Sequence, residues 1–287
     1  MTIWTDLTGV AFALEFVDAG GVVTRALTAG RGEDVLMLHG TSGHLEAFSR
    51  NVVPHVRAGF RVHAIDALGH GYTDKPREPY EIFKYGAHVL RYLDVRGIDR
   101  AHLVGESLGG WTSAWLAIHH PDRVAGVELV AAGGTKADPS VMQRIKESTR
   151  RAVQTDDVAF TRERLELLMH SAADVSDELV EIRHAIYHQP AFVENIDNLL
   201  CLQEMEIRQR NLLRPEDLAK ISAPTLIVWG TNNPFGQVTE ATAMHEHIAG
   251  SELAIFTECG HWPQHEQSEK FNELSISFLK RHPIAAS

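Results

Sequence analysis

The sequence lacks the features that direct a chain into or across a membrane. No apolar run reaches about 18 residues, the length needed to span a bilayer. The first ten residues, MTIWTDLTGV, lack the basic and apolar regions of a secretory signal peptide. Cysteine is scarce as well, since Cys201 and Cys259 are the only two and form no disulfide framework. We therefore expect a cytoplasmic protein.

Positive charge is also in short supply. The 287 residues include 27 lysines and arginines against 38 aspartates and glutamates, a formal net charge of −11. Nucleic acids and anionic membrane surfaces bind basic proteins, so this balance argues against both as partners. The expected partner is a small molecule.

Histidine is abundant, with 17 residues, but the spacings typical of metal sites are missing. The pairs His119–His120 and His245–His247 match no H-E-x-x-H or paired-cysteine motif. His119 and His120 fall at the end of an expected helix, where imidazoles often lie near free carbonyls. We expect no metal and no cofactor.

What the sequence does contain is a regular alternation of strand and helix patterns. Two alternating segments, 11–18 and 22–29, predict an opening β-hairpin. Apolar runs predict further strands within 34–40, 60–71, 100–107, 124–134, 225–230 and 252–260. Helical spacing predicts helices within 81–97, 108–120, 239–250 and 269–282. This order predicts an α/β fold with a mostly parallel sheet, doubly wound with helices on both faces.

The character of the sequence changes between residues 136 and 223, where charged, leucine-rich helical patterns replace strand patterns. We expect 1–135 and 224–287 to form the core and 136–223 to form an inserted helical lid. Long insertions at strand ends usually cover the site that those ends form. The alternative is a set of helices that only stabilises one edge of the sheet.

A serine in a tight turn is the strongest chemical signal. Gly105-Glu106-Ser107-Leu108-Gly109 forms the pattern G-x-S-x-G between an expected strand and an expected helix. Such a turn presents the Ser107 hydroxyl at a helix N-terminus, where backbone N–H groups favour a developing negative charge. We expect Ser107 to be a nucleophile, and Glu106 to support the turn.

A base and an oxyanion hole are expected beside this serine. His261, in ECGHWP just past the last expected strand, is the candidate base, because the strand ends of a parallel sheet gather at one edge. The segment HGTSGH follows the first buried strand. Its Thr41 N–H, together with that of Leu108, is expected to hold a developing oxyanion.

The segments LHGTSG, GHGYTDKP, GESLGGW and CGHWPQHE, in this order, resemble the α/β-hydrolase superfamily. Within it the sequence, from about residue 34 to 280, is most similar to the carbon–carbon hydrolases that cleave ring-fission (meta-cleavage) products in aromatic catabolism. The resemblance implies the α/β-hydrolase fold and a homodimer. It also implies that Asn51, Arg183, Trp262 and Ser42 contact the substrate, Arg183 because its fork suits a carboxylate.

The resemblance fails at the acid that supports the histidine. The family has aspartate in the pattern W-G-x-x-D, whereas WGTNN places Asn233 there. The acid normally fixes the imidazole tautomer and stabilises the imidazolium, and asparagine carries no charge for the second task.

Four interpretations of Asn233 stay open. In the first, the Asn233 carbonyl accepts the His261 N–H and the enzyme works more slowly. In the second, another carboxylate supports His261, although no acid follows the strand ending ELVAAGG until Asp138. Alternatively, the substrate dienol supplies the acidity, or the asparagine is a substitution made to trap a ligand.

The sequence therefore predicts a serine-dependent hydrolase that cleaves a C–C bond in a vinylogous diketone acid. The alternatives are a carboxylesterase or lactonase, a lyase on the same fold, and a catalytically weakened ligand-binding relative.

Overall fold

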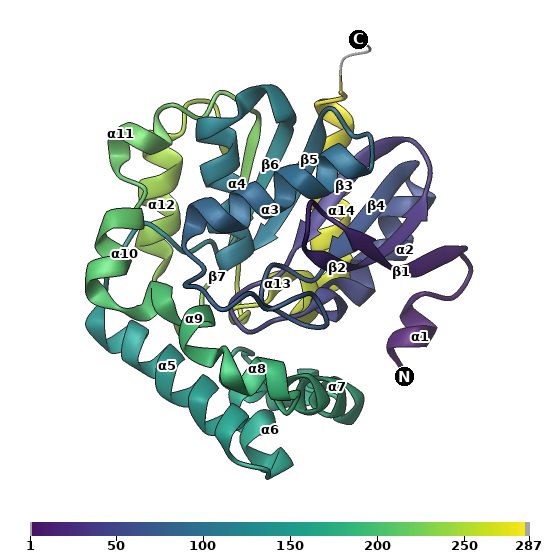
Figure 1. Cartoon of the computed structure of the whole chain (residues 1–287). Coiled ribbons are helices and arrows are strands. Elements are labelled where there is room, and N and C mark those ends of the chain that lie inside the picture. The colour runs from purple at the N-terminus through teal and green to yellow at the C-terminus, as the bar shows by residue number, and fades with distance from the viewer. Residues whose placement is uncertain (1, 285–287) are drawn as a thin grey trace.

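The computed structural model describes residues 2–284 and contains one eight-stranded sheet with the order β1-β2-β4-β3-β5-β6-β7-β8 (Figure 1). Its strands are β1 (Phe12–Asp18), β2 (Val23–Gly30), β3 (Glu33–Leu38), β4 (Phe60–Ile65), β5 (Ala101–Glu106), β6 (Val124–Val130), β7 (Thr225–Gly230) and β8 (Glu252–Phe256). β1 and β2 form the expected antiparallel hairpin, and β2 also pairs antiparallel with β4. All other pairs are parallel, which confirms the predicted sheet.

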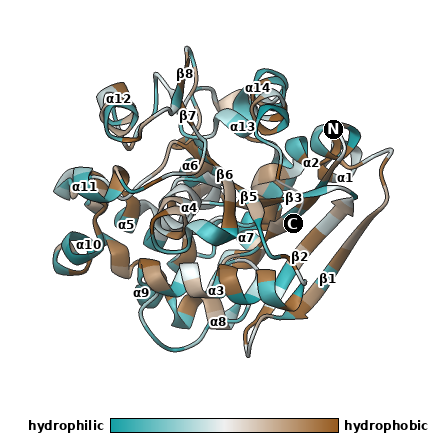
Figure 2. Ribbon diagram, turned by 90° about the horizontal axis from the view of Figure 1, so that it is seen from above, coloured by the Kyte–Doolittle hydropathy of each residue, from teal (hydrophilic) through white to brown (hydrophobic). Residues whose placement is uncertain are grey.

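Helices cover both faces of this sheet (Figure 2). One face packs on α3 (Ile82–Val95), α4 (Leu108–His119) and α12 (Val238–His247), and the other on α2 (Ser49–Arg57) and α14 (Ser268–Arg281). Successive strand residues point to opposite faces, so Leu36 and Leu38 enter the first core whereas Val35 and Met37 enter the second. This two-sided burial explains why the parallel strands read as continuous apolar runs.

Between β6 and β7 the described chain forms only helices. They are α5 (Pro139–Gln154), α6 (Val158–Glu166), η3 (Ala172–Asp174), α7 (Asp177–Tyr187), α8 (Pro190–Glu194), α9 (Ile196–Leu199), η4 (Cys201–Gln203), α10 (Met205–Asn211) and α11 (Pro215–Leu218). Figure 1 shows α5 to α8 as a group below the sheet. The remaining helices are α1 (Ile3–Asp6), η1 (Leu45–Phe48), η2 (Pro121–Arg123) and α13 (Pro263–Glu266). None of the helices in residues 2–284 is long and apolar enough to cross a membrane.

Helix α2 was not predicted, because Pro54 lies inside it. Proline removes the N–H that would bond to the carbonyl four residues earlier, which is that of Arg50. The Asn272 side chain of α14 instead donates to the Arg50 carbonyl at 3.0 Å. A contact from a distant helix thus satisfies the group that proline leaves free, and local sequence patterns do not reveal such a contact.

A buried chain of hydrogen bonds connects α2, α14 and the sheet. Burial lowers the pKa of His55 to about 4, so its ring is neutral. Nδ1 of His55 donates to the Asn51 carbonyl at 2.7 Å, and Nε2 accepts from the Ser275 hydroxyl at 2.8 Å. Oε1 of Glu128 lies 2.7 Å from Ser275 Oγ, and burial raises the pKa of Glu128 to about 8. A protonated Glu128 completes the chain by donating to Ser275.

Glu128→Gln is therefore expected to stabilise the protein at pH 8 but not at pH 5. Between the unfolded and folded pKa of Glu128, the native state holds a proton that the unfolded chain has released. The free energy of unfolding then falls by about 1.4 kcal/mol per pH unit as pH rises, up to the folded pKa. The glutamine amide keeps a donor for Ser275 and removes this slope. Urea unfolding at both pH values checks the difference, with the exposed Glu147→Gln as control; an equal effect at both pH values contradicts it.

Candidate active site

Ser107 occupies a strained turn between β5 and α4. Its φ is 53° and its ψ is −110°, a backbone conformation that residues other than glycine rarely adopt. Three hydrogen bonds hold it there: Ser107 N–H donates to the Val130 carbonyl at 2.9 Å, and the Ser107 carbonyl accepts from Trp111 and Gly133 at 3.0 Å. Strain maintained in this way is typical of functional sites.

Both glycines of the motif are needed for close packing. A Cβ on Gly105 would lie 2.3 Å from the Gly109 carbonyl oxygen. A Cβ on Gly109 would lie 2.0 Å from the carbonyl oxygen of Leu38, at the end of the neighbouring strand β3. The G-x-S-x-G pattern is therefore a packing requirement of this turn.

Gly109→Ala is expected to destabilise the protein by about 3 kcal/mol or more, because the added methyl group overlaps a backbone atom that cannot move aside. Gly133→Ala is the matched control, since its added Cβ would come no closer than 3.8 Å to its neighbours. Chemical denaturation of both variants measures the effect. Equal stability of the two would contradict this account of the turn.

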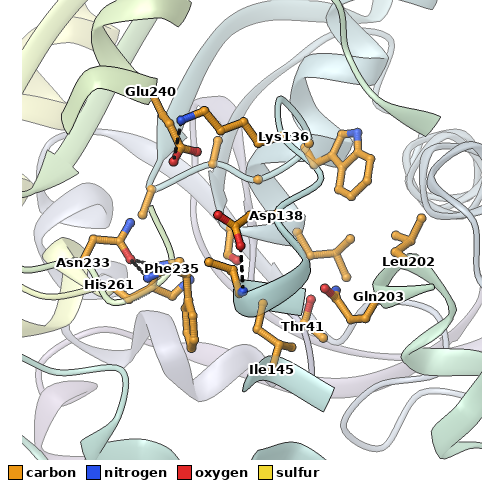
Figure 3. Close-up of a pocket in the computed structure, with 18 of the residues that line it drawn as sticks. Thr41, Lys136, Asp138, Ile145, Leu202, Gln203, Asn233, Phe235, Glu240 and His261 are labelled. Carbon is orange, nitrogen blue, oxygen red and sulfur yellow. Dashed lines mark hydrogen bonds and ion pairs between the residues drawn. The ribbon is translucent and has the colours of Figure 1, made fainter. Parts of the chain in front are cut away.

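The ends of four parallel strands bring the predicted residues to one edge of the sheet. Thr41 follows β3, Ser107 follows β5, Asn233 follows β7 and His261 follows β8. All four line one pocket, together with Leu108, Lys136, Asp138, Ile145, Gln203, Arg208, Phe235 and Glu240 (Figure 3). An adjoining pocket also contains Ser107 and His261, and its further lining includes Gly40, Glu106, Arg164, Leu168 and Trp262.

The two expected oxyanion donors are suitably placed. Thr41 lines both pockets and Leu108 lines the first. Leu108 is the first residue of α4, where a backbone N–H has no acceptor within the helix. Their role as donors stays a prediction.

His261 contacts the residue at the acid position. Its Nδ1 lies 2.9 Å from Asn233 Oδ1, and the same oxygen accepts the Phe235 N–H at 3.1 Å (Figure 3). The Phe235 ring packs edge-on against the imidazole, with 5.0 Å between ring centroids. The backbone N–H of His261 donates to the Leu168 carbonyl at 2.7 Å, and this bond connects the histidine to the helical insertion.

The other ring nitrogen faces a residue without a predicted part in catalysis. Nε2 of His261 lies 3.1 Å from Oε1 of Glu106. Among the described residues, no hydrogen bond joins Ser107 Oγ to His261, a looseness common in sites without substrate. The sequence contained one indication of this contact, because an acidic residue stands directly before the serine while position 233 holds no acid.

Arg183, on α7, is buried and lines neither pocket, but it packs against Trp262, which lines the second. Its Nη1 donates to the Tyr187 hydroxyl at 3.2 Å, and that hydroxyl donates to Ser42 Oγ at 3.0 Å. The guanidinium carbon lies 5.4 Å from the centre of the Trp262 ring. Nε and Nη2 of Arg183 are buried without a partner among the described residues. Buried donors of this kind are costly unless a ligand pairs with them.

Arg164, on α6, was missed in the sequence. It is buried and lines the second pocket, and its Nη1 has no partner within the described part of the chain. Burial, reinforced by the charge of Arg183 and opposed by Tyr187 and Glu106, lowers the pKa of Arg164 to about 10. Burial alone would raise the pKa of Tyr187, but the charges of Arg183 and Arg164 outweigh it and lower that pKa. Two buried, incompletely paired cations therefore lie at or beside the second pocket, Arg164 in its lining and Arg183 behind Trp262.

Asn51 lies apart from both pockets. Its amide donates to the Gln264 carbonyl at 2.9 Å and to Asn272 Oδ1 at 2.8 Å. The side chain joins α2 to the C-terminal helices, and its contact with substrate stays a prediction. Ser42 is also not among the lining residues and meets the pocket region only through Tyr187.

Asp138, the nearest acid after β6, is committed to capping α5. Its Oδ1 accepts from the N–H groups of Ser140 and Val141 at 2.9 and 3.2 Å. A different trio, Asp156, His184 and His188, has ligand atoms within 4.8 Å of one another, but none of the three lines the pockets at Ser107.

Comparison with known proteins agrees with this geometry. Residues 35–268 match the family described as alpha/beta hydrolase fold. The chain belongs to this family. The 2-hydroxy-6-oxononadienedioate/2-hydroxy-6-oxononatrienedioate hydrolase of Klebsiella pneumoniae subsp. pneumoniae is 32% identical to this α/β hydrolase over 276 residues, covering 92% of this chain and 94% of the relative.

Two further relatives extend the comparison. The 2-hydroxy-6-oxo-6-phenylhexa-2,4-dienoate hydrolase of Comamonas testosteroni is 31% identical over 261 residues, covering 88% of this chain and 90% of the relative. The structure of a meta-cleavage product hydrolase from Pseudomonas fluorescens IP01 superimposes on this α/β hydrolase with a TM-score of 0.81 at 27% identity, covering 95% of this chain and 99% of that chain. The resemblance to meta-cleavage product hydrolases is thus confirmed.

Proposed function

We propose that this α/β hydrolase uses water to cleave the C–C bond beside the ketone of a 2-hydroxy-6-oxo-dienoate. The observation that carries the proposal is a pair of buried guanidiniums with unpartnered nitrogens: Arg164 lines the second pocket together with Ser107, and Arg183 lies against Trp262 of the same pocket. A guanidinium fork binds a carboxylate through two parallel hydrogen bonds. A dienoate supplies that carboxylate at one end of the molecule, whereas a simple ester does not.

The residues act in the following order. His261 Nε2 takes the proton from Ser107, or from a water that Ser107 orients, while the oxygen nucleophile attacks the ketone carbon. Thr41 and Leu108 donate N–H groups to the resulting oxyanion. Before the attack the dienol ketonises, its enol proton moving to the carbon that will leave. When the C–C bond breaks, its electron pair passes through the conjugated chain to the oxygen at carbon 2, and the proton on His261 goes to that dienolate. Where Ser107 is the nucleophile, a water activated by His261 then hydrolyses the acyl group from the serine and the serine regains its proton. Arg183, beside Trp262, holds the carboxylate end.

The helical insertion 136–223 is proposed to be a lid over the core formed by 1–135 and 224–287. Both arginines lie on its helices, α6 and α7. Besides the bond from His261 to Leu168, the His170 N–H donates to Glu266 Oε2 at 2.7 Å. The insertion is thus attached to the loop that bears the catalytic histidine.

The test is the decay of visible absorbance of a phenyl-substituted 2-hydroxy-6-oxo-dienoate, with benzoate measured as product. Simple aryl esters and lactones are assayed beside it. The proposal expects benzoate to form in step with the absorbance loss. Hydrolysis of esters or lactones with an unchanged dienoate would instead favour the esterase or lactonase, and inertness toward all three would favour a ligand-binding relative.

A homodimer is also proposed, with the edge strand β1 as the contact. Within residues 2–284, β1 pairs only with β2 and its outer edge has no further strand. Phe12, Leu14 and Phe16 alternate along one face and are 37%, 45% and 60% exposed. An apolar, unpaired edge strand is a ready template for pairing with a second copy.

Sedimentation of Phe16→Glu tests this contact. The native chain is expected to sediment as a dimer and the variant as a monomer, while Phe83→Glu, which changes an exposed phenylalanine on α3, stays dimeric. A monomeric native chain would overturn the proposal.

A cytoplasmic location is also proposed. It is supported by two buried, unpaired thiols, Cys201 and Cys259, because a reducing compartment keeps thiols free.

A further inference from the structure

The two tasks of a triad acid are separated in this site. One task is to fix which imidazole nitrogen carries the hydrogen, and the other is to provide negative charge for the imidazolium. Asn233 meets Nδ1 of His261 at 2.9 Å, whereas Glu106 meets Nε2 at 3.1 Å. The imidazole thus lies between a neutral amide and a carboxylate, on opposite ring nitrogens.

Asn233 is held in the orientation that the first task needs. Its Oδ1 accepts the Phe235 N–H, and a flipped amide would set two N–H groups against each other. Oδ1 therefore faces the ring, and Nδ1 of His261 must carry a hydrogen to donate to it. Nε2 is left with a lone pair for the proton of the nucleophile. An asparagine at the acid position need not produce the wrong tautomer.

Glu106 is built into the site as a buried carboxyl group. It is 1% exposed, and neither carboxylate oxygen has a hydrogen-bond partner within the described residues. A Cβ on Gly40 would lie 2.5 Å from Oε2, so the carboxylate occupies space that only glycine leaves there. The charged groups that share its pocket are His261 and Arg164.

A buried carboxylate without hydrogen bonds is costly unless a cation is nearby. Arg164 is one cation in its pocket, and protonation of His261 adds a second at 3.1 Å from Oε1. We propose that Glu106 supplies the negative charge that Asn233 lacks and stabilises the His261 imidazolium from its Nε2 side. Glu106 is a positioning residue in this scheme and forms no bond to the substrate. The proposal rests on the serine and histidine roles given above.

The test is a double-mutant cycle of native protein, Glu106→Gln, Asn233→Asp and the double variant. The main readout is the rate at which a fluorophosphonate labels Ser107, since this reaction needs the base but not the dienoate. Glu106→Gln is expected to slow labelling by about 10²-fold. Asn233→Asp is expected to gain less than about 3-fold alone but at least about 30-fold in the Glu106→Gln background, because the two acids substitute for each other.

Equal gains from Asn233→Asp in both backgrounds, or unchanged labelling in Glu106→Gln, would overturn the proposal. If Glu106→Gln does not fold, Glu106→Asp and Glu106→Asn form a pair of equal size that differs in charge. The aspartate variant is then expected to label at least about 10-fold faster than the asparagine variant, and equal rates would contradict the role of charge. If the labelling rates follow the predicted cycle but the dienoate is not cleaved, the proposed function is overturned and the role of Glu106 is retained.

Discussion

Ser107→Ala is expected to reduce turnover of a 2-hydroxy-6-oxo-dienoate by about 10⁴-fold or more, with little change in the free energy of unfolding. The hydroxyl lies at the start of α4, facing the pocket that His261 and Thr41 also line. Alanine keeps the backbone of the turn but removes the nucleophile or water-orienting group. Steady-state kinetics and chemical denaturation of the same preparation measure both quantities.

Ser113→Ala is the matched control for this experiment. Ser113 is also buried on α4, where its hydroxyl donates only to the Gly109 carbonyl at 2.8 Å. This variant is expected to stay within a few-fold of native turnover. If Ser107→Ala kept more than about a tenth of native activity, catalysis would not depend on the strained serine.

Arg183→Met is expected to lower kcat/KM for the dienoate by about 10²–10³-fold while raising stability by about 1–3 kcal/mol. The loss follows from removing the partner of the substrate carboxylate. The gain follows from removing two buried guanidinium nitrogens, Nε and Nη2, that have no partner in the described residues. Methionine fills similar space and keeps an apolar contact with Trp262. Kinetics and thermal unfolding measure the two opposite changes.

Arg162→Met is the control for the arginine experiment. Arg162 lies on α6 and pairs with Asp177 at the surface, with 37% of its side chain exposed. Neither kcat/KM nor stability is expected to change appreciably. A loss of stability in Arg183→Met without a loss of substrate affinity would show that the arginine serves the lid structure rather than the ligand.

Local patterns predicted the sheet and the serine turn, because both depend on neighbours in sequence. The runs that became β3, β5 and β7 are mainly apolar, since both faces of these strands are buried. The glycines beside Ser107 are fixed by packing within the same turn and against β3. The last strand ends at Phe256, sooner than expected, because the segment after it turns toward His261.

The charges around His261 could not be predicted in the same way. Arg164 and Arg183 reach the pocket region through the packing of helices α6 and α7, which no local spacing specifies. Glu106 was expected only to support the turn, and its contact with His261 depends on how β5 and the loop after β8 meet. The partners of Asn51 come from α13 and α14, far along the chain, so local patterns could not predict them either.

The most direct measurement compares kcat/KM of the unmodified protein for a 2-hydroxy-6-oxo-dienoate, for the methyl ester of its carboxylate and for an aryl acetate. The account predicts that the free dienoate is cleaved fastest, at its C–C bond. Masking the carboxylate should then cost about 10²-fold, because the buried arginines lose their anionic partner. A faster aryl acetate together with an uncleaved dienoate would contradict the account.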